Sequence, residues 1–187
     1  TAFLVDLESQ GVACGRYDGI GEHAVGHGSL FLDGVIVPKE NRLGEEGAGF
    51  VQVMQGFDFS RALIGLQCLA VARKSLAETW VYITERQSFG RPLSVNQGVT
   101  FPLAEYDTYL EAARLLCLKT LAAKDAGVHH TREAAMCKWW APKIAFEAIH
   151  QCLLMHGHSG YSKDMPFDQR LRDVLGLQIG DGTAQIM

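Results

Sequence analysis

A carboxylate between two glycines stands near the end of the sequence, in Gly180-Asp181-Gly182-Thr183. The glycines leave room for a substrate to reach the acid while the chain holds it in place. An apolar cleft raises the proton affinity of a carboxylate, so Asp181 could act as a general base. The same residues are also typical of a plain turn, with the aspartate capping a helix that opens through Thr183. Taken alone, they favour the turn.

An arginine and a glutamine frame a second motif, Arg86-Gln-Ser-Phe89-Gly90 followed by Gln97. The planar guanidinium of an arginine can pair with two phosphate oxygens at once. A helix that begins near Gln97 would add backbone N–H groups suited to an anion. The alternative is a solvated arginine beside an ordinary loop between two helices, and these residues alone favour that alternative.

A glycine turn is the third motif, Gly157-His158-Ser159-Gly160-Tyr161. Two glycines three positions apart allow a tight turn and a close approach of the backbone to a ligand. A simple helix stop explains them as well. His150, His156 and His158 lie nearby, but no carboxylate or cysteine completes a recognisable ligand set. The sequence therefore does not predict a metal site.

The composition is that of an ordinary globular protein. Of the 187 residues, 48% are hydrophobic and 20% charged, and the formal net charge is −4. Without a basic tail, this balance argues against nucleic acid and anionic membranes as partners. No apolar run approaches the roughly 18 residues of a membrane span. Five scattered cysteines, never spaced as Cys-x-x-Cys, argue against a disulfide framework and favour a reducing compartment.

The elements that must position these motifs differ along the chain. Residues 1–45 carry short apolar runs punctuated by glycine, and we expect strands at Ala2–Val5, Ser29–Leu32 and Val35–Val37. Three short strands cannot form a stable sheet alone. This part is therefore predicted to be the end of a larger β-domain. Because Thr1 already opens an apolar run, we also expect residues upstream of it.

Residues 46–187 follow the helical period instead. We expect one helix from Phe50 to about Arg86, with Gly56 as a candidate break, and a second from Asn96 to Ala126, where Pro102 marks a kink or a late start. Further helices are expected over 131–156, bent at Pro142, and over 167–177. Long helices joined by short loops predict a mainly α domain, an antiparallel four-helix bundle.

Together, the three motifs and their order resemble the acyl-CoA dehydrogenase family over essentially the whole chain. The stretch Leu30–Phe50 is similar to the passage from the family's middle β-domain into its C-terminal helices, and Ser60-Arg61 to an arginine in the first of those helices. The remaining matches are to its R-x-x-F-G and Gln motif, its glycine turn and following helix, and its end motif: Arg86, Phe89, Gly90, Gln97, Gly157, Gly160, Tyr161, Arg172, Asp173, Gly182 and Thr183.

This resemblance implies an FAD-dependent enzyme that removes the α-proton of an acyl-CoA thioester while the β-hydrogen leaves as hydride to the flavin. It implies Asp181 as the base, with its own N–H helping to bind the thioester oxygen. Arg61 and Gly182 would bind substrate, and the flavin contacts would be Arg86, Phe89, Gln97, Gly157, Gly182 and Thr183. The implied partners are an electron-transferring flavoprotein and further copies of the chain, as a homodimer or homotetramer, in the bacterial cytoplasm or the mitochondrial matrix.

The sequence departs from the family pattern at named positions. The family usually has glutamate where Asp181 stands, and aspartate is shorter by about 1.5 Å, so an unusual substrate such as a cyclic or branched acyl-CoA is expected. A few members place the base on the first C-terminal helix, where this chain has Ser60. His158 replaces a usual glycine, and Leu154 replaces a common flavin-contacting glutamine.

The family's N-terminal helical domain, most of its β-domain and its last helix have no counterpart in this sequence. We therefore expect the chain alone neither to hold FAD tightly nor to turn over. Two alternatives stay open: an oxidase of the same fold, acting on an acyl-CoA or a nitroalkane, and a helical interaction module without chemistry.

Overall fold

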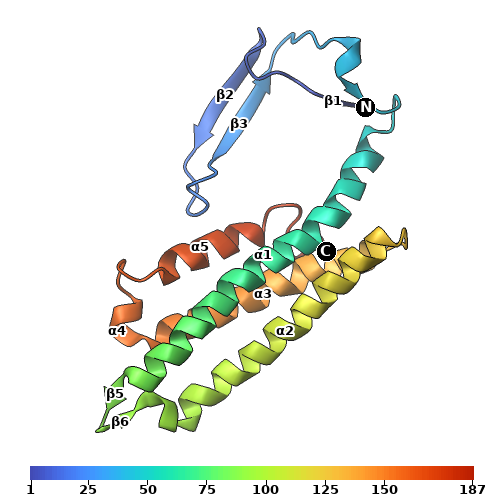
Figure 1. Ribbon diagram of the computed structural model, residues 1–187. Helices are drawn as coiled ribbons and strands as arrows, with labels where there is room; N and C mark the ends of the chain where they lie inside the picture. The colour runs from blue at the N-terminus through green and yellow to red at the C-terminus, as the bar shows by residue number, and fades with distance from the viewer. The chain divides into compact units, whose positions relative to one another are not determined.

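The computed structural model describes all 187 residues, which form two compact units, Thr1–Phe57 and Asp58–Met187. The chain is mainly helical, with a few short strands (Figure 1). The fold class expected from the sequence is therefore confirmed. The predicted domain division after residue 45 stays a prediction.

The first unit contains two separate two-stranded antiparallel sheets. Strand β1 (Ala2–Phe3) pairs with β4 (Arg42–Leu43), and β2 (Val12–Tyr17) pairs with β3 (His27–Leu32) in a register that runs from Val12 opposite Leu32 to Tyr17 opposite His27. A short 3-10 helix, η1 (Lys39–Asn41), precedes β4.

The strand predictions for this unit are partly correct. Ser29–Leu32 lies within β3, and the first strand is present but shorter than expected. Val35–Val37 is not a strand: it pairs with no other segment and leads from Asp33-Gly34 into η1. Apolar side chains of β3, such as Phe31, are more than half exposed. Two-stranded ribbons bury little surface on their own.

The second unit is a helical bundle. Its helices are α1 (Gly49–Glu85, which begins in the first unit), α2 (Gln97–Asp125), α3 (Thr131–Met155), the single turn α4 (Gly157–Gly160) and α5 (Phe167–Leu177). A hairpin of β5 (Gln87–Ser88) and β6 (Arg91–Pro92), followed by the 3-10 helix η2 (Leu93–Val95), joins α1 to α2. Figure 1 shows the long helices running in alternating directions.

The three residues expected to break, kink or bend a helix all lie within continuous helices. Helix α1 passes through Gly56, α2 begins at Gln97 and contains Pro102, and α3 contains Pro142. The late start expected at Pro102 is therefore wrong. Because Pro102 is the sixth residue of α2, it costs only one hydrogen bond close to the helix start.

The core lies between α1, α2, α3 and α5, and includes Leu69, Leu110, Ile149 and Phe167. Helix α1 comes very close to α2 and α3 at Gly65. A Cβ atom there would lie 2.8 Å from Cys117 Sγ and 3.2 Å from Ala141 Cβ. A glycine is thus required at this crossing.

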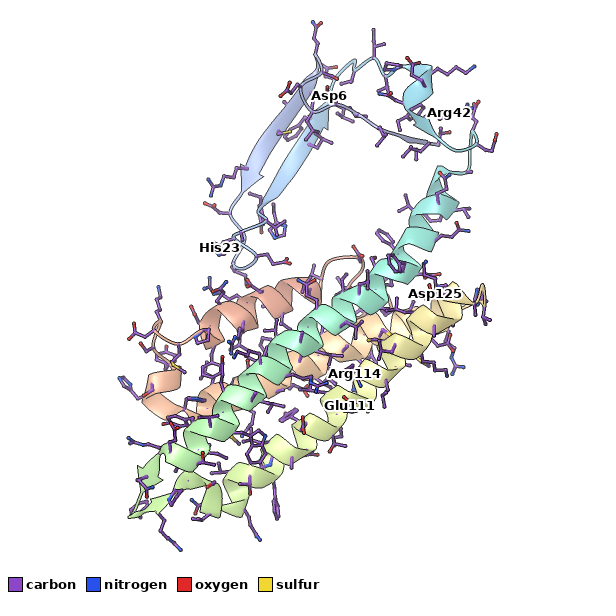
Figure 2. The ribbon with its side chains drawn as sticks, in the orientation of Figure 1. Asp6, His23, Arg42, Glu111, Arg114 and Asp125 are labelled. Atoms are coloured by element: carbon purple, nitrogen blue, oxygen red, sulfur yellow. The ribbon has the colours of Figure 1, made fainter.

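Ion pairs stabilise the outside of the bundle only weakly. Figure 2 shows Glu111 and Arg114 on α2, where the guanidinium donates to the carboxylate at 2.7 and 2.8 Å. Arg73 of α1 reaches the same carboxylate at 3.1 Å. These side chains are 35–48% exposed, and exposed ion pairs contribute little to stability. The positioning of the functional residues therefore depends mainly on the apolar core.

Candidate active site

Asp181 lies in a turn that follows the end of α5. Residues 178–181 and 184–186 form turns, Gly182 is a bend and Thr183 is irregular, so the helix expected to open through Thr183 is absent. The reason lies in the backbone: Asp181 has φ +55° and Gly182 has φ +104°, and neither value continues a right-handed helix. A positive φ is uncommon for a non-glycine residue and persists where the surroundings fix it.

Side chains from α1 and α3 provide those surroundings. Ser60 Oγ donates a hydrogen bond to Asp181 Oδ2. Arg61 Nε donates to the backbone carbonyl of Asp181 at 3.4 Å, and Lys138 Nζ donates to the carbonyl of Gly182 at 3.0 Å. The carboxylate thus bonds to a distant helix rather than to amides of its own turn. The interpretation of Asp181 as a helix cap is therefore wrong.

A second carboxylate orients Arg61. Asp58 Oδ1 lies 3.5 Å from Arg61 Nη1, and Thr131 Oγ1 donates to Asp58 Oδ2. The Arg61 and Asp58 side chains are only 14% and 15% exposed, so this pair is screened less by solvent than a surface pair. The network joins the starts of the α1 and α3 portions of the bundle to the Asp181 turn.

Lys138 is a functional candidate that the sequence analysis missed. Its side chain is 1% exposed, and burial lowers the pKa of its ammonium group. The nearby Cys68 and Asp181 oppose this shift, while Arg61 adds to it. The signal was present in the sequence, because Lys138 occupies the same stripe of α3 as the buried Ala134, Ala141 and Ala145. Lysines are rarely fully buried unless their charge is paired, so a lysine on an apolar helix stripe indicates a polar partner inside the protein.

The other predicted flavin contacts lie at the opposite end of α1. Arg86 follows the helix, and its carbonyl accepts the N–H of Leu93, which closes the loop around the β5–β6 hairpin. Phe89 and Gly90 form the hairpin tip with φ +49° and +77°, and the Phe89 ring is completely exposed. Gln97, also exposed, is the first residue of α2.

Gly157 lies at that same end. It has φ +59° and follows His156, whose ring stacks on Tyr82 of α1 with centroids 4.1 Å apart. Leu154, where the family commonly has glutamine, is exposed. From Ser60 to Glu85, α1 rises about 1.5 Å at each of 25 residue steps, so about 38 Å separates the two ends. One chain therefore brings Arg61, Asp181, Gly182 and Thr183 together, but not with Arg86, Phe89, Gln97 or Gly157.

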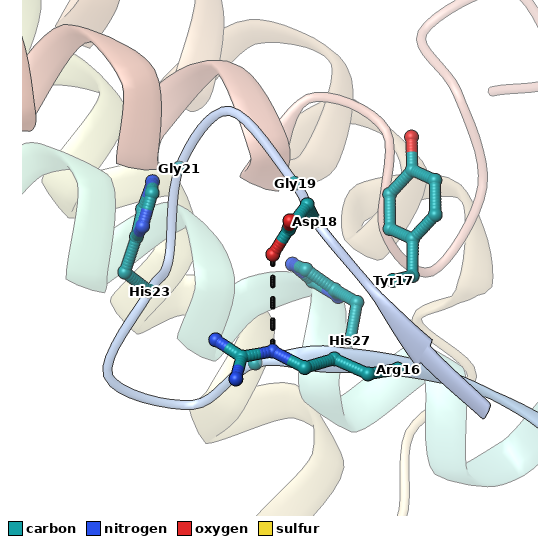
Figure 3. Close-up of a pocket in the computed structure, with 8 residues that line it drawn as sticks. Arg16, Tyr17, Asp18, Gly19, Gly21, His23 and His27 are labelled. Atoms are coloured by element: carbon teal, nitrogen blue, oxygen red, sulfur yellow. Dashed lines mark ion pairs between the residues drawn. The ribbon is translucent and has the colours of Figure 1, made fainter. Parts of the chain in front are cut away.

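Each of the two units has a surface hollow. One, of about 350 Å³, lies beside the Asp181 turn and is lined by Arg132, Ala135, Met136 and Trp139 of α3 with Ala184 and Met187. The other, of about 240 Å³, lies in the loop between β2 and β3 (Figure 3). Its Arg16–Asp18 ion pair, 3.8 Å long, has side chains at least 91% exposed. Such a pair is weak, and we assign this second hollow no function.

Neither a metal site nor a membrane span is found in the structure. No three histidine, cysteine, aspartate or glutamate side chains come together as a set of metal ligands. No helix combines the length and the apolar character needed to cross a bilayer. Four of the five cysteines are buried thiols, and Cys14 is exposed.

Comparison with known proteins assigns the whole helical bundle, with both of its ends, to one family. Residues 47–187 match the family model described as acyl-CoA dehydrogenase, C-terminal domain. The caffeyl-CoA reductase-Etf complex subunit CarC of Acetobacterium woodii is 35% identical over 191 residues, covering 100% of this chain and 49% of that protein. The cyclohexane-1-carbonyl-CoA dehydrogenase of Geobacter metallireducens is 35% identical over 185 residues, 98% of this chain and 49% of that protein.

A solved structure gives the same result. Butyryl-CoA dehydrogenase from Megasphaera elsdenii superimposes with a TM-score of 0.94 at 34% identity, over 98% of this chain and 48% of that one. The chain thus spans about half the length of the curated relatives it matches. With the family model matching most of its length, this chain belongs to the acyl-CoA dehydrogenase family.

Proposed function

We propose that this chain is the C-terminal part of an FAD-dependent acyl-CoA dehydrogenase in which Asp181 removes the α-proton of the thioester. The observation that carries the proposal is the arrangement of the carboxylate. Ser60, 121 positions away in the chain, donates to Oδ2 and so holds the carboxylate in place. The turn is only partly exposed, and a fixed, partly desolvated carboxylate suits general base catalysis.

The residues present fit a flavin dinucleotide. When bound, the flavin supplies the acceptor for the β-hydride. Arg86 is exposed beside the start of α2, whose first N–H groups have no helical partners, and both suit phosphate oxygens. The exposed ring of Phe89 offers an apolar face at the same end. Gly157, also at this end, allows a close approach at its turn. At the other end, Gly182 and Thr183 present backbone amides beside the base.

The separation of about 38 Å between the two ends supports an oligomer. Asp181, Gly182 and Thr183 of one copy would meet one cofactor, and Arg86, Phe89 and Gln97 of that copy would meet the cofactor of a neighbour. The site is then completed by a second copy, as a homodimer or a homotetramer. An electron-transferring flavoprotein is the proposed redox partner, which agrees with the name of the Acetobacterium relative, a subunit of a reductase-Etf complex.

The shorter reach of Asp181 supports a cyclic or branched acyl group as substrate. A ring carbon bonded directly to the thioester carbonyl brings a hindered α-proton, and a compact base between two glycines, which have no side chains, leaves room for it. The Geobacter relative is named for such a substrate, cyclohexane-1-carbonyl-CoA. The Acetobacterium relative is named a reductase, which favours the reverse reaction as a second candidate. In that direction Asp181 would return a proton to the α-carbon.

The test is the variant Asp181→Asn in the full-length protein that carries this chain. We expect turnover with an electron acceptor to fall by roughly 10²–10⁴-fold, with the flavin still bound. Asp107→Asn, an exposed position on α2, is the matched control and should leave turnover unchanged. Nearly intact turnover in Asp181→Asn would exclude it as the base.

Two further measurements separate the alternatives. Peroxide formation in air, with little transfer to an acceptor, would identify an oxidase. A wild-type protein that binds neither FAD nor an acyl-CoA would identify a non-catalytic module. Rates measured with saturated and with unsaturated acyl-CoA distinguish the dehydrogenase from the reductase.

A further inference from the structure

The burial of Lys138 is unusual because its charge has no carboxylate partner in contact. The side chain is 1% exposed, among the largest fully buried ones in the chain. Its ammonium makes no ion pair within 4.0 Å, and its one hydrogen bond goes to the carbonyl of Gly182, at 3.0 Å. Fully buried lysines are rare unless paired, and burying a charge is costly. A neutral backbone carbonyl is therefore the group that this ammonium holds.

This hydrogen bond fixes the orientation of one peptide group. The chain has no cis peptide bonds, and in a planar trans peptide the C=O and N–H bonds point in opposite directions. With the Gly182 carbonyl directed at Lys138, the N–H of Thr183 points away from it. Arg61 acts in the same way on the preceding peptide, where it holds the Asp181 carbonyl and directs the N–H of Gly182 away from α1.

Both amides are available to a ligand. Neither the Gly182 nor the Thr183 N–H donates to any group of this chain, although the Thr183 carbonyl accepts the N–H of Ile186. The two residues are partly exposed and adjoin Asp181. Backbone N–H groups held in one orientation beside a base are suited to an acceptor oxygen, since they need no reorganisation when it binds.

We propose that Lys138 is a positioning residue that holds the Gly182 carbonyl against the bundle and so presents the Thr183 amide, together with that of Gly182, to an acceptor oxygen of the bound ligand. This inference rests on the proposed function. The oxygen belongs either to the thioester carbonyl or to the flavin cofactor. Lys138 itself touches neither, because its side chain ends inside the bundle.

The experiment follows amide hydrogen exchange at Gly182 and Thr183 in the full-length protein. Four states are compared: cofactor-free, FAD-loaded, and FAD-loaded with either a non-reactive acyl-CoA thioester or the matching CoA thioether, which lacks the carbonyl oxygen. Protection of about tenfold or more that appears with the thioester and not with the thioether assigns the oxygen to the substrate. The same protection on FAD loading assigns it to the cofactor.

Variants then test the part played by Lys138. Lys138→Met keeps the length and the apolar stem, and we expect it to abolish the protection and to lower kcat by about tenfold with little change in KM. Lys138→Arg keeps a charged donor and should restore part of both. Lys143→Met, at an exposed lysine on the same helix, is the control and should behave as wild type.

The outcomes separate this inference from the proposed function. A wild-type protein that turns over without protecting either amide in any state overturns the positioning role and leaves the function intact. Wild-type protection that survives in a folded Lys138→Met also overturns it. A protein that binds neither FAD nor acyl-CoA overturns the proposed function instead. Exchange in the wild type decides whether the two amides bind a ligand. Where Lys138→Met fails to fold, Lys138→Arg tests the part played by Lys138, because a displaced donor should reduce the protection, and fully wild-type protection and kcat would overturn the positioning role.

Discussion

Replacing Gly182 by alanine would test whether the shape of the Asp181 turn matters for activity. Gly182 has φ +104°, which L side chains rarely adopt. A Cβ atom built there would lie 2.6 Å from Met187 Cε and 3.7 Å from Arg61 Nη2. The methionine methyl group is the end of a flexible side chain and can move, so the backbone angle is the larger obstacle.

The size of the effect follows from that angle. Holding a non-glycine residue in a sparsely populated backbone region costs about 1–3 kcal/mol. The turn can avoid this cost by rotating out of its present conformation, which would break the hydrogen bond from Lys138 to the Gly182 carbonyl. The population of the present turn then falls by roughly 5- to 150-fold, and kcat/KM should fall by a similar factor.

The assay compares kcat/KM and thermal stability of Gly182→Ala and Gly180→Ala in the full-length protein. Gly180 has no unusual φ, and the nearest atom to its Cβ would be 3.9 Å away, so alanine fits there. We expect only Gly182→Ala to lose activity, with a small change in melting temperature, because the turn rearranges without opening the core. Equal losses in both variants, or full activity in Gly182→Ala, would refute the reasoning.

Two predictions concern stability, measured by thermal or urea unfolding. Arg170 donates to the Glu78 carboxylate at 2.5 and 3.2 Å and lowers the pKa of that carboxylate. The stability that this ion pair contributes is therefore present above pH 4.5 and is lost as the pH falls through the lowered pKa. Glu78→Gln should cost about 1 kcal/mol at neutral pH and reduce the acid sensitivity; an unchanged pH profile would contradict this. Gly65→Ala should destabilise the protein by about 1–3 kcal/mol through overpacking. Gly56→Ala is the control: its Cβ would meet nothing within 4 Å, so it should stabilise the protein by about 0.5–1 kcal/mol. A Gly65→Ala variant more stable than Gly56→Ala would disprove the close helix crossing.

The helices could be predicted from the sequence because each carries its own period and its own stop signals. The expected segment 167–177 coincides with α5, and α1 ends one residue before Arg86. Strand β2 could not be predicted, since Val12–Tyr17 contains a glycine and lacks clean alternation. Its pairing with the next strand, β3, is not announced by a tight turn either, because residues 18–26 form a longer loop between the two strands.

The site was predictable as a list of residues but not as an arrangement. Local chemistry at Asp181 favoured a helix cap, and the bond from Ser60 depends on a contact across 121 positions. The sequence shows Lys138 as a lysine on an apolar helix stripe but does not show its partner, because that partner is a backbone carbonyl and not a side chain. The motif around Arg86 gave no indication that α1 would separate it from Asp181. Spacing along a chain cannot report such distances until the helices that contain the residues are known.

The length of α1 also has a thermodynamic consequence in the proposed oligomer. A cofactor held by the Asp181 end of one copy and the Arg86 end of another links two equilibria, the binding of cofactor and the association of subunits. Because linkage is reciprocal, the free energy by which cofactor binding stabilises the assembly equals the free energy by which assembly strengthens cofactor binding. Dilution would then release flavin, and added flavin would favour the reassociation of separated subunits. Cofactor content would be a property of protein concentration as much as of any single residue.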